Sequence, residues 1–370
     1  MHKTFALLLV ISSFGARAQS LDRVVAESRK LGTLAAAKGN SQDLQLALRD
    51  WAESLLPRTA AALTSELPRS ESAINAALRG AGLRGRTGWD LSGAYTPGAV
   101  ESVKLRRPKE DATKVVLTIG VEIPCGDEEA TYVYDYSGGS PRRVIESPVP
   151  EGGSGVLAVD FSAPDRSGMQ SILVLRYGVQ CGSSWNRLDY DWHRLAKGAK
   201  RAISVLQDQH YIWFSGNPAY HVRLTGDELL IELLDRSIDV EVHHRTHVLH
   251  YRATGGSAER IDPVALQPQD FVDEWLTRPW SEMESRSVGG NVLEKWHEDI
   301  GGGQYLFVQR CRNRADTQIG LMADGRSGYF VVHQLDQYRF EMKSVSFERQ
   351  EGCPGESPAL TDGPSLFPKR

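Results

Sequence analysis

Histidines gather in one short segment of this sequence, and imidazole is the side chain best suited to metal binding and to proton transfer near neutral pH. Four of the ten histidines lie between His243 and His250. If the segment is a strand, His243 and His247 share one face, whereas in a helix His243, His247 and His250 would line one face. Neither arrangement has an identifiable third ligand, and no H-E-x-x-H motif occurs. We therefore expect these histidines to contact a ligand, with no bound metal and no cofactor.

Aromatic residues provide a second candidate binding surface. Tyr211 and Trp213 alternate in a strand-like segment, so both side chains would lie on the same face of a sheet. Such rings can stack on a sugar or a peptide, although packing within a β-sheet explains them equally well. The residues expected to bind a ligand are therefore His243, His247, Tyr211 and Trp213.

Carboxylates give a weaker indication of chemistry. Two carboxyl groups can hydrolyse a glycosidic bond, but the reaction depends on their separation in space, which a sequence does not give. A solvated loop explains the most acidic stretch better, and no intact nucleophile motif or phosphate-binding motif is present. We therefore assign no catalytic residue. The acidic stretch consists of Glu122, Asp127, Glu128 and Glu129.

The cysteines are even in number and contain no C-x-x-C pair, which disfavours zinc binding and thioredoxin-like chemistry. An even count in an exported chain favours disulfides. We expect the pairs Cys125–Cys181 and Cys311–Cys353, because each pair lies within one region of the sequence.

The N-terminal segment 1–18 has the three parts of a secretory signal peptide. A basic start is followed by an apolar run from Phe5 to Phe14 and by the small-x-small site Ala16-Arg17-Ala18. The run is too short to span a bilayer, which takes about 20 residues. We expect a periplasmic or extracellular protein without stable membrane insertion.

The charge balance argues against nucleic acid as a partner. The chain has 43 basic and 47 acidic residues, with a net charge of −4, and the charges are dispersed rather than gathered in a basic stripe. The partner is expected to be an extracytoplasmic ligand or protein of unknown identity.

Hydrophobic periodicity divides the chain into a helical part and a strand-rich part. Leu44, Leu48, Trp51 and Leu55 form one apolar stripe at helical spacing, whereas alternation of period two begins near residue 99. The expected segments are, in order, a signal peptide (1–18), a helical segment (19–90), repeated antiparallel β units (91–266), a helical linker (267–300), a C-terminal β unit (301–354) and a disordered tail (355–370).

A weak internal repeat suggests how the strands are arranged. Similar hairpin-like segments precede Arg143, Arg201 and Arg260, which recur at nearly equal intervals along the chain. Four-stranded antiparallel units of this length are typical of β-propeller blades. The alternatives are a two-sheet β-sandwich and a similarity that reflects only the Gly-rich chemistry of hairpin turns.

These observations favour an exported binding or scaffold protein without catalytic activity, because no catalytic motif is intact. The alternative is an extracytoplasmic hydrolase that acts on a glycan or a peptide. The alternative gains support if these histidines and at least one carboxylate converge in one concave pocket of the folded chain, whereas scattered residues favour the binding protein.

Overall fold

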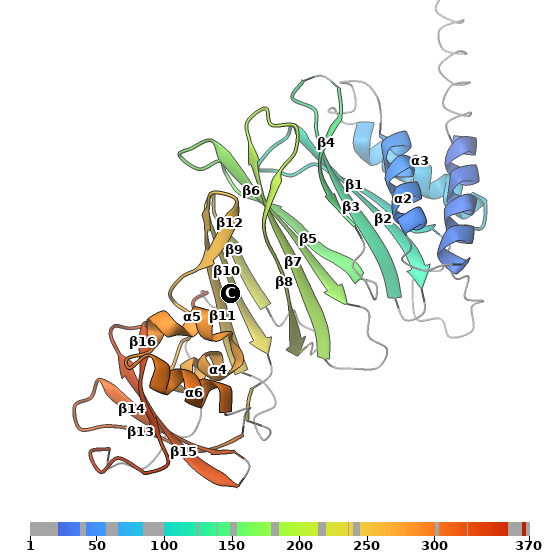
Figure 1. The fold of residues 1–370 in the computed structure, drawn as a ribbon. Coiled ribbons are helices and arrows are strands. Elements are labelled where there is room, and N and C mark those ends of the chain that lie inside the picture. Colours follow the sequence, from blue (N-terminus) through green and yellow to red (C-terminus); the bar gives the residue numbers. More distant parts are fainter. Residues whose placement is uncertain are drawn as a thin grey trace, which may run out of the picture. The chain divides into compact units, whose positions relative to one another are not determined.

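A computed structural model describes residues 21–37, 42–56, 66–83, 100–123, 126–138, 140–148, 154–178, 185–213, 220–235, 237–239, 245–299, 303–323, 325–353 and 365–367. The expected signal peptide and the residues Cys125, Cys181 and His243 lie outside this part of the chain. The chain divides into two units (Figure 1). The N-terminal unit comprises Met1–Ser183 with Arg187–Gln209, and the C-terminal unit comprises Ser184–Asn186 with His210–Arg370.

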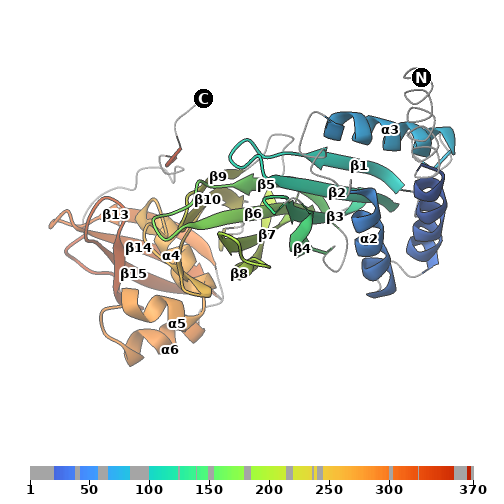
Figure 2. The same cartoon turned by 90° about the horizontal axis from the view of Figure 1, so that it is seen from above.

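Helices cover one face of a sheet in the N-terminal unit (Figure 2). Residues 21–37 form a helix, followed by α2 (Gln42–Leu55) and α3 (Glu66–Gly80). The apolar stripe expected from helical spacing is buried against this sheet, because packing of an amphipathic face supplies most of a short helix's stability. The residues of that stripe are Leu44, Leu48, Trp51 and Leu55.

The sheet beneath these helices is an antiparallel meander in the order β1-β2-β3-β4. Its second face packs against the next strands of the unit through one apolar cluster, in which Val116 and Val133 meet Ile172 and Val174. The strands of the unit are β1 (Val100–Arg106), β2 (Lys114–Ile123), β3 (Gly126–Asp135), β4 (Arg142–Ser147), β5 (Ser154–Phe161), β6 (Met169–Gly178), β7 (Trp185–Ala196) and β8 (Ile203–Trp213), and the ends of the last two belong to the C-terminal unit.

The C-terminal unit places the helix α4 (Pro268–Thr277) against a second meander in the order β13-β14-β15-β16. The unit also contains an antiparallel group in which β10 pairs with both β9 and β11, and β11 pairs with β12. The remaining elements are β9 (Tyr220–Leu224), β10 (Glu228–Asp235), β11 (Arg245–Thr254), β12 (Ser257–Arg260), α5 (Trp280–Met283), the 3₁₀ turn Glu284–Arg286, α6 (Asn291–Asp299), β13 (Gln304–Arg310), β14 (Asp316–Ala323), β15 (Arg326–Gln334) and β16 (Phe340–Ser346).

The fold is mainly β, with antiparallel sheets and a short N-terminal helical segment, as the sequence predicts. Among the described strands, β1–β4 and β13–β16 each form a four-stranded antiparallel sheet, and no sheet closes on itself. These sheets support the mainly β, antiparallel fold but do not show a propeller. The repeated segments are hairpin turns between neighbouring strands, and Gly198 and Gly255 have the positive φ angles of 76° and 65° that such turns require. Turn chemistry therefore explains the repeat.

One expected disulfide is present in the C-terminal unit. Cys311 and Cys353 are bonded across a sequence separation of 42 residues, and both are buried. No helix in the described part of the chain has the length and apolar character needed to cross a membrane.

Candidate active site

Helix α4 carries buried acids although it also packs into an apolar core. Phe271, Val272 and Trp275 are fully buried against the β13–β16 sheet. Pro268 lies in the first turn, where backbone N–H groups have no acceptor within the helix, so proline breaks no helical hydrogen bond there. A buried carboxylate is stable only when it is paired, so the elements packed on α4 must supply partners. The buried acids of this helix are Asp270, Asp273 and Glu274.

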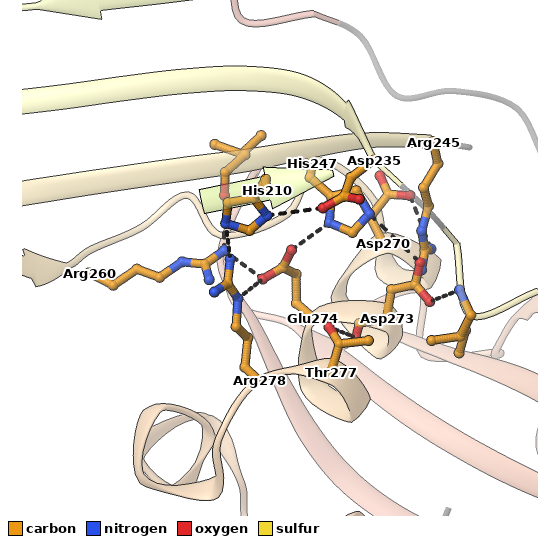
Figure 3. A network of polar contacts seen from close by, with 12 residues as sticks. His210, Asp235, Arg245, His247, Arg260, Asp270, Asp273, Glu274, Thr277 and Arg278 are labelled. Atoms are coloured by element: carbon orange, nitrogen blue, oxygen red, sulfur yellow. Dashed lines mark hydrogen bonds and ion pairs between the residues drawn. The ribbon is translucent and has the colours of Figure 1, made fainter. Parts of the chain in front are cut away.

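Glu274 is the centre of the polar network (Figure 3). Its Oε1 lies 2.6 Å from His247 Nδ1, and its Oε2 lies 2.5 Å from Arg260 Nη2 and 3.3 Å from Arg278 Nε. Burial alone would raise the pKa of Glu274, but Arg260, His247 and Arg278 outweigh it and hold this pKa well below its ordinary value. Glu274 is therefore ionised at neutral pH, and His247 donates its Nδ1–H to it.

Asp273 forms a second buried centre beside Glu274. Arg245 pairs with Asp273 and donates a hydrogen bond of 2.8 Å to the carbonyl of Gln269. The Tyr305 hydroxyl donates to the same carbonyl at 3.1 Å. Burial raises the pKa of Tyr305 to about 12 against the opposing effect of Arg245, so the phenol stays neutral. These contacts join α4 to the start of β11 and to β13.

A histidine–carboxylate pair continues the network on β8 and β10. His210 Nδ1 lies 3.0 Å from Asp235 Oδ2, and His210 Nε2 lies 3.2 Å from Arg278 Nη2. A guanidinium can only donate, so Nε2 is the unprotonated nitrogen and Nδ1–H donates to Asp235. Asp235 thus fixes the tautomer in which the Nε2 lone pair of His210 can accept a proton.

Exposure separates the two ends of this network. The side chains of Asp273 and Glu274 are 0% and 2% exposed. Those of His210, Asp235 and Arg278 are 11%, 17% and 16% exposed. His210, Asp235 and Arg278 thus form the more accessible end of the network, and the buried Glu274 holds Arg278 in place.

The structure settles the conformation of the described part of the histidine segment. Residues 245–250 belong to a strand, so His247 and His250 point to opposite faces. His247 faces α4, whereas His250 Nδ1 lies 2.6 Å from the carbonyl of Asp262. Among the described residues, no group of three or more His, Cys, Asp or Glu side chains is arranged to hold a metal ion.

The two aromatic candidates lie on a different face from His247. Ile212 pairs with Asp235 and lies on the side of α4, so alternation places Tyr211 and Trp213 on the opposite face of β8. Tyr211 is 43% exposed, and the Trp213 ring meets Trp185 edge to face at a centroid distance of 5.2 Å. Of the expected ligand-binding residues that the structure describes, His247 therefore lies apart from Tyr211 and Trp213.

The acidic stretch is not a solvated loop where the structure describes its side chains. Glu128 and Glu129 are buried on opposite faces of β3. Glu129 lies 2.7 Å from Lys104 Nζ and accepts the backbone N–H of Val156 at 2.6 Å. Burial raises the pKa of Glu128. Neither residue belongs to the network around α4.

Sequence reasoning missed most of the network because its members are far apart in the chain. A usable signal was present in the expected helical linker, where Asp270, Asp273 and Glu274 fall at i, i+3 and i+4 among apolar residues. Acids at this spacing beside a buried helical stripe indicate a charged patch that needs basic partners. The missed residues are His210, Asp235, Arg245, Arg260, Asp270, Asp273, Glu274 and Arg278.

No family model matches the chain, and no curated protein matches it. Solved structures that it resembles include a GH43 β-1,3-galactosidase with galactodeoxynojirimycin, at 11% identity and a TM-score of 0.19, over 69% of this chain and 79% of that chain. An endo-arabinase from Bacteroides thetaiotaomicron VPI-5482 matches at 9% identity and a TM-score of 0.20, over 73% and 79%. A third match, described as a glycoside hydrolase, has 8% identity and a TM-score of 0.16, over 73% and 91%. At such low identities and TM-scores, the role of a residue in these proteins cannot be carried over to a residue of this chain.

The expectation of an exported non-catalytic binding or scaffold protein is corrected, because histidines and carboxylates converge in the folded chain at His210–Asp235 and His247–Glu274. That expectation rested on the absence of a local catalytic motif. Hydrolytic carboxylates and histidines need no local motif, because the fold can assemble them from distant segments, as it does for His210 and Glu274.

Proposed function

We propose that this protein is a hydrolase that acts on a glycan outside the cytoplasm. The observation that carries the proposal is the convergence of His210 and His247 with buried and half-buried carboxylates in one network (Figure 3). Clusters of ionisable groups with perturbed pKa values are typical of catalytic sites. The Cys311–Cys353 disulfide supports an oxidising compartment.

We assign proton abstraction to His210. During hydrolysis a base takes a proton from water while the water oxygen attacks the anomeric carbon, the glycosidic C–O bond breaks, and the leaving oxygen takes up a proton from the solvent. His210 Nε2 suits this role because Asp235 fixes its tautomer and because the pair lies at the accessible end of the network. A water molecule at Nε2 replaces the contact with Arg278, which keeps its bond to Glu274. Glu274 and His247 are positioning residues.

The expected ligand contacts of Tyr211 and Trp213 remain part of this proposal as a separate sugar-stacking surface. The rings lie on the face of β8 away from His210, so they would hold a distant part of a long glycan. His243 remains a proposed ligand contact from the sequence alone.

The test is release of reducing ends from a panel of polysaccharides that includes galactans and arabinans. We expect hydrolysis by the chain from residue 19 onward, and a loss of roughly 100-fold or more in His210→Ala and Asp235→Asn, because a positioned base contributes about 10²–10⁴-fold. His333→Ala is the matched control, since His333 also pairs with an aspartate, Asp316, at 2.5 Å, but lies outside the network. Peptide cleavage without glycan cleavage, or full activity in His210→Ala, would refute the proposal.

A further inference from the structure

A short piece of the C-terminal segment lies on the face of the β9–β10–β11 group that is turned away from α4. The backbone N–H of Leu366 donates to Glu232 Oε2 at 2.8 Å. The Phe367 ring stacks on His221 at a centroid distance of 5.3 Å and an interplanar angle of 28°. The guanidinium carbon of Arg223 lies 5.9 Å from the centre of the same ring. Three different strand residues thus contact two consecutive tail residues.

Strand register explains why these residues form one surface. Glu232 pairs with His221 on β9, and Leu230 pairs with Arg223, so the side chains of these four residues share one face. The floor is apolar and consists of Leu230, Val248 and Leu266, against which Leu366 and Phe367 are partly buried. A surface with an apolar floor, an aromatic stacking partner and one carboxylate has the composition of a small recognition site.

The chemistry of the site selects a particular kind of ligand. Glu232 is only 6% exposed, and a buried carboxylate requires a donor, which the main-chain N–H of Leu366 provides. His221 and Arg223 both favour the π face of an aromatic ring. These contacts therefore favour a peptide segment in which a residue with a free backbone N–H is followed by an aromatic residue.

We propose that this face, defined by His221, Arg223, Leu230, Glu232 and Val248, is a binding site for a peptide that carries a Leu-Phe step. The chain's own Leu366–Phe367 occupies it as an intramolecular ligand. The site is distinct from the α4 network and does not depend on the hydrolase proposal. Leu233 pairs with His247 and lies on the α4 side of β10, so the side chain of the preceding residue, Glu232, points to the opposite face.

The test adds a labelled synthetic peptide of residues 361–370 to full-length protein and measures fluorescence anisotropy. In the wild type the tethered segment competes, whereas Phe367→Ala frees the site. We expect the peptide to bind the Phe367→Ala protein at least 10-fold more tightly than the wild type. We expect binding to disappear when His221→Ala or Glu232→Gln is added.

Two controls make the result decisive. A peptide with alanine in place of Phe367 should not bind, and Phe347→Ala, which alters an exposed aromatic residue elsewhere in the unit, should behave like the wild type. Equal binding to wild type and Phe367→Ala, or no binding to either, would overturn the proposal. If Glu232→Gln fails to fold, the His221→Ala result alone decides, because that substitution removes an exposed stacking partner.

Discussion

The two units bury arginine in different ways. In the N-terminal unit Arg176 is 1% exposed and donates to neutral acceptors, at 2.6 Å to the Ser147 carbonyl and 2.9 Å to the Ser147 hydroxyl, and also to the Glu129 carbonyl. In the described part of the chain no carboxylate forms an ion pair with it, and burial lowers its pKa to about 10. In the C-terminal unit Arg245 and Arg260 contact carboxylates directly.

This difference separates a structural cross-link from a candidate reactive centre. Arg176 fastens β3, β4 and β6 together through hydrogen bonds to uncharged groups. The network around Glu274 instead holds several ionised groups in fixed geometry, which is the condition for electrostatic preorganisation. Both regions bury arginine, and they differ in whether the buried arginine forms an ion pair with a carboxylate.

The largest expected effect is in the C-terminal unit. Glu274→Gln removes the buried carboxylate that Arg260 and Arg278 share, which should cost about 3–5 kcal/mol. Hydrogen exchange of peptides from α4, followed through urea unfolding, measures the loss in this unit alone. Glu282→Gln is the control, because Glu282 lies 3.8 Å from Arg260 but its side chain is 39% exposed. A control that costs as much as Glu274→Gln would contradict the central role of Glu274.

A smaller effect is expected in the N-terminal unit. Arg176→Met keeps an extended side chain but leaves the Ser147 and Glu129 carbonyls without a donor, at a cost of about 2 kcal/mol. No carboxylate loses an ion-pair partner among the described residues in this variant. Hydrogen exchange of peptides from β6 checks the prediction, and a loss above that of Glu274→Gln would remove the contrast between the two units.

The smallest expected effect is a change in the acid dependence of stability. The folded-state pKa of Glu274 is below its ordinary value, so its contribution is complete above the ordinary glutamate pKa and is lost as pH falls through the folded-state pKa. The stability difference between wild type and Glu274→Gln should therefore shrink from pH 5 to pH 2 by at most about 1.4 kcal/mol per pH unit. Urea midpoints measured at several pH values test this, and a difference that grows on acidification would be the wrong sign.

Local patterns predicted local structure well. The apolar spacing of Leu44, Leu48, Trp51 and Leu55 identified buried helix positions. The period of apolar residues shows which face of a helix or strand is buried. This information lies within a short stretch of sequence, so it can be found without knowing the fold.

Spatial assembly was beyond the reach of the same patterns. His210 and Glu274 are joined through Arg278, which contacts both, and no spacing in the sequence encodes that contact. The arrangement of the sheets was out of reach for a related reason, since Gly-rich turns repeat in any protein built from hairpins. Similar turns specify hairpins and do not specify how sheets close.

The Cys311–Cys353 bond has a consequence for the Leu366–Phe367 ligand. The bond fixes Cys353, which precedes Leu366 by 13 residues in the sequence. Neighbouring contacts strengthen this anchor, because Arg349 donates a hydrogen bond of 2.5 Å to Gln309 and the Gly352 carbonyl accepts one of 3.1 Å from the backbone of Arg312. A ligand attached this close to a fixed point has a far higher local concentration at its face than a free peptide has.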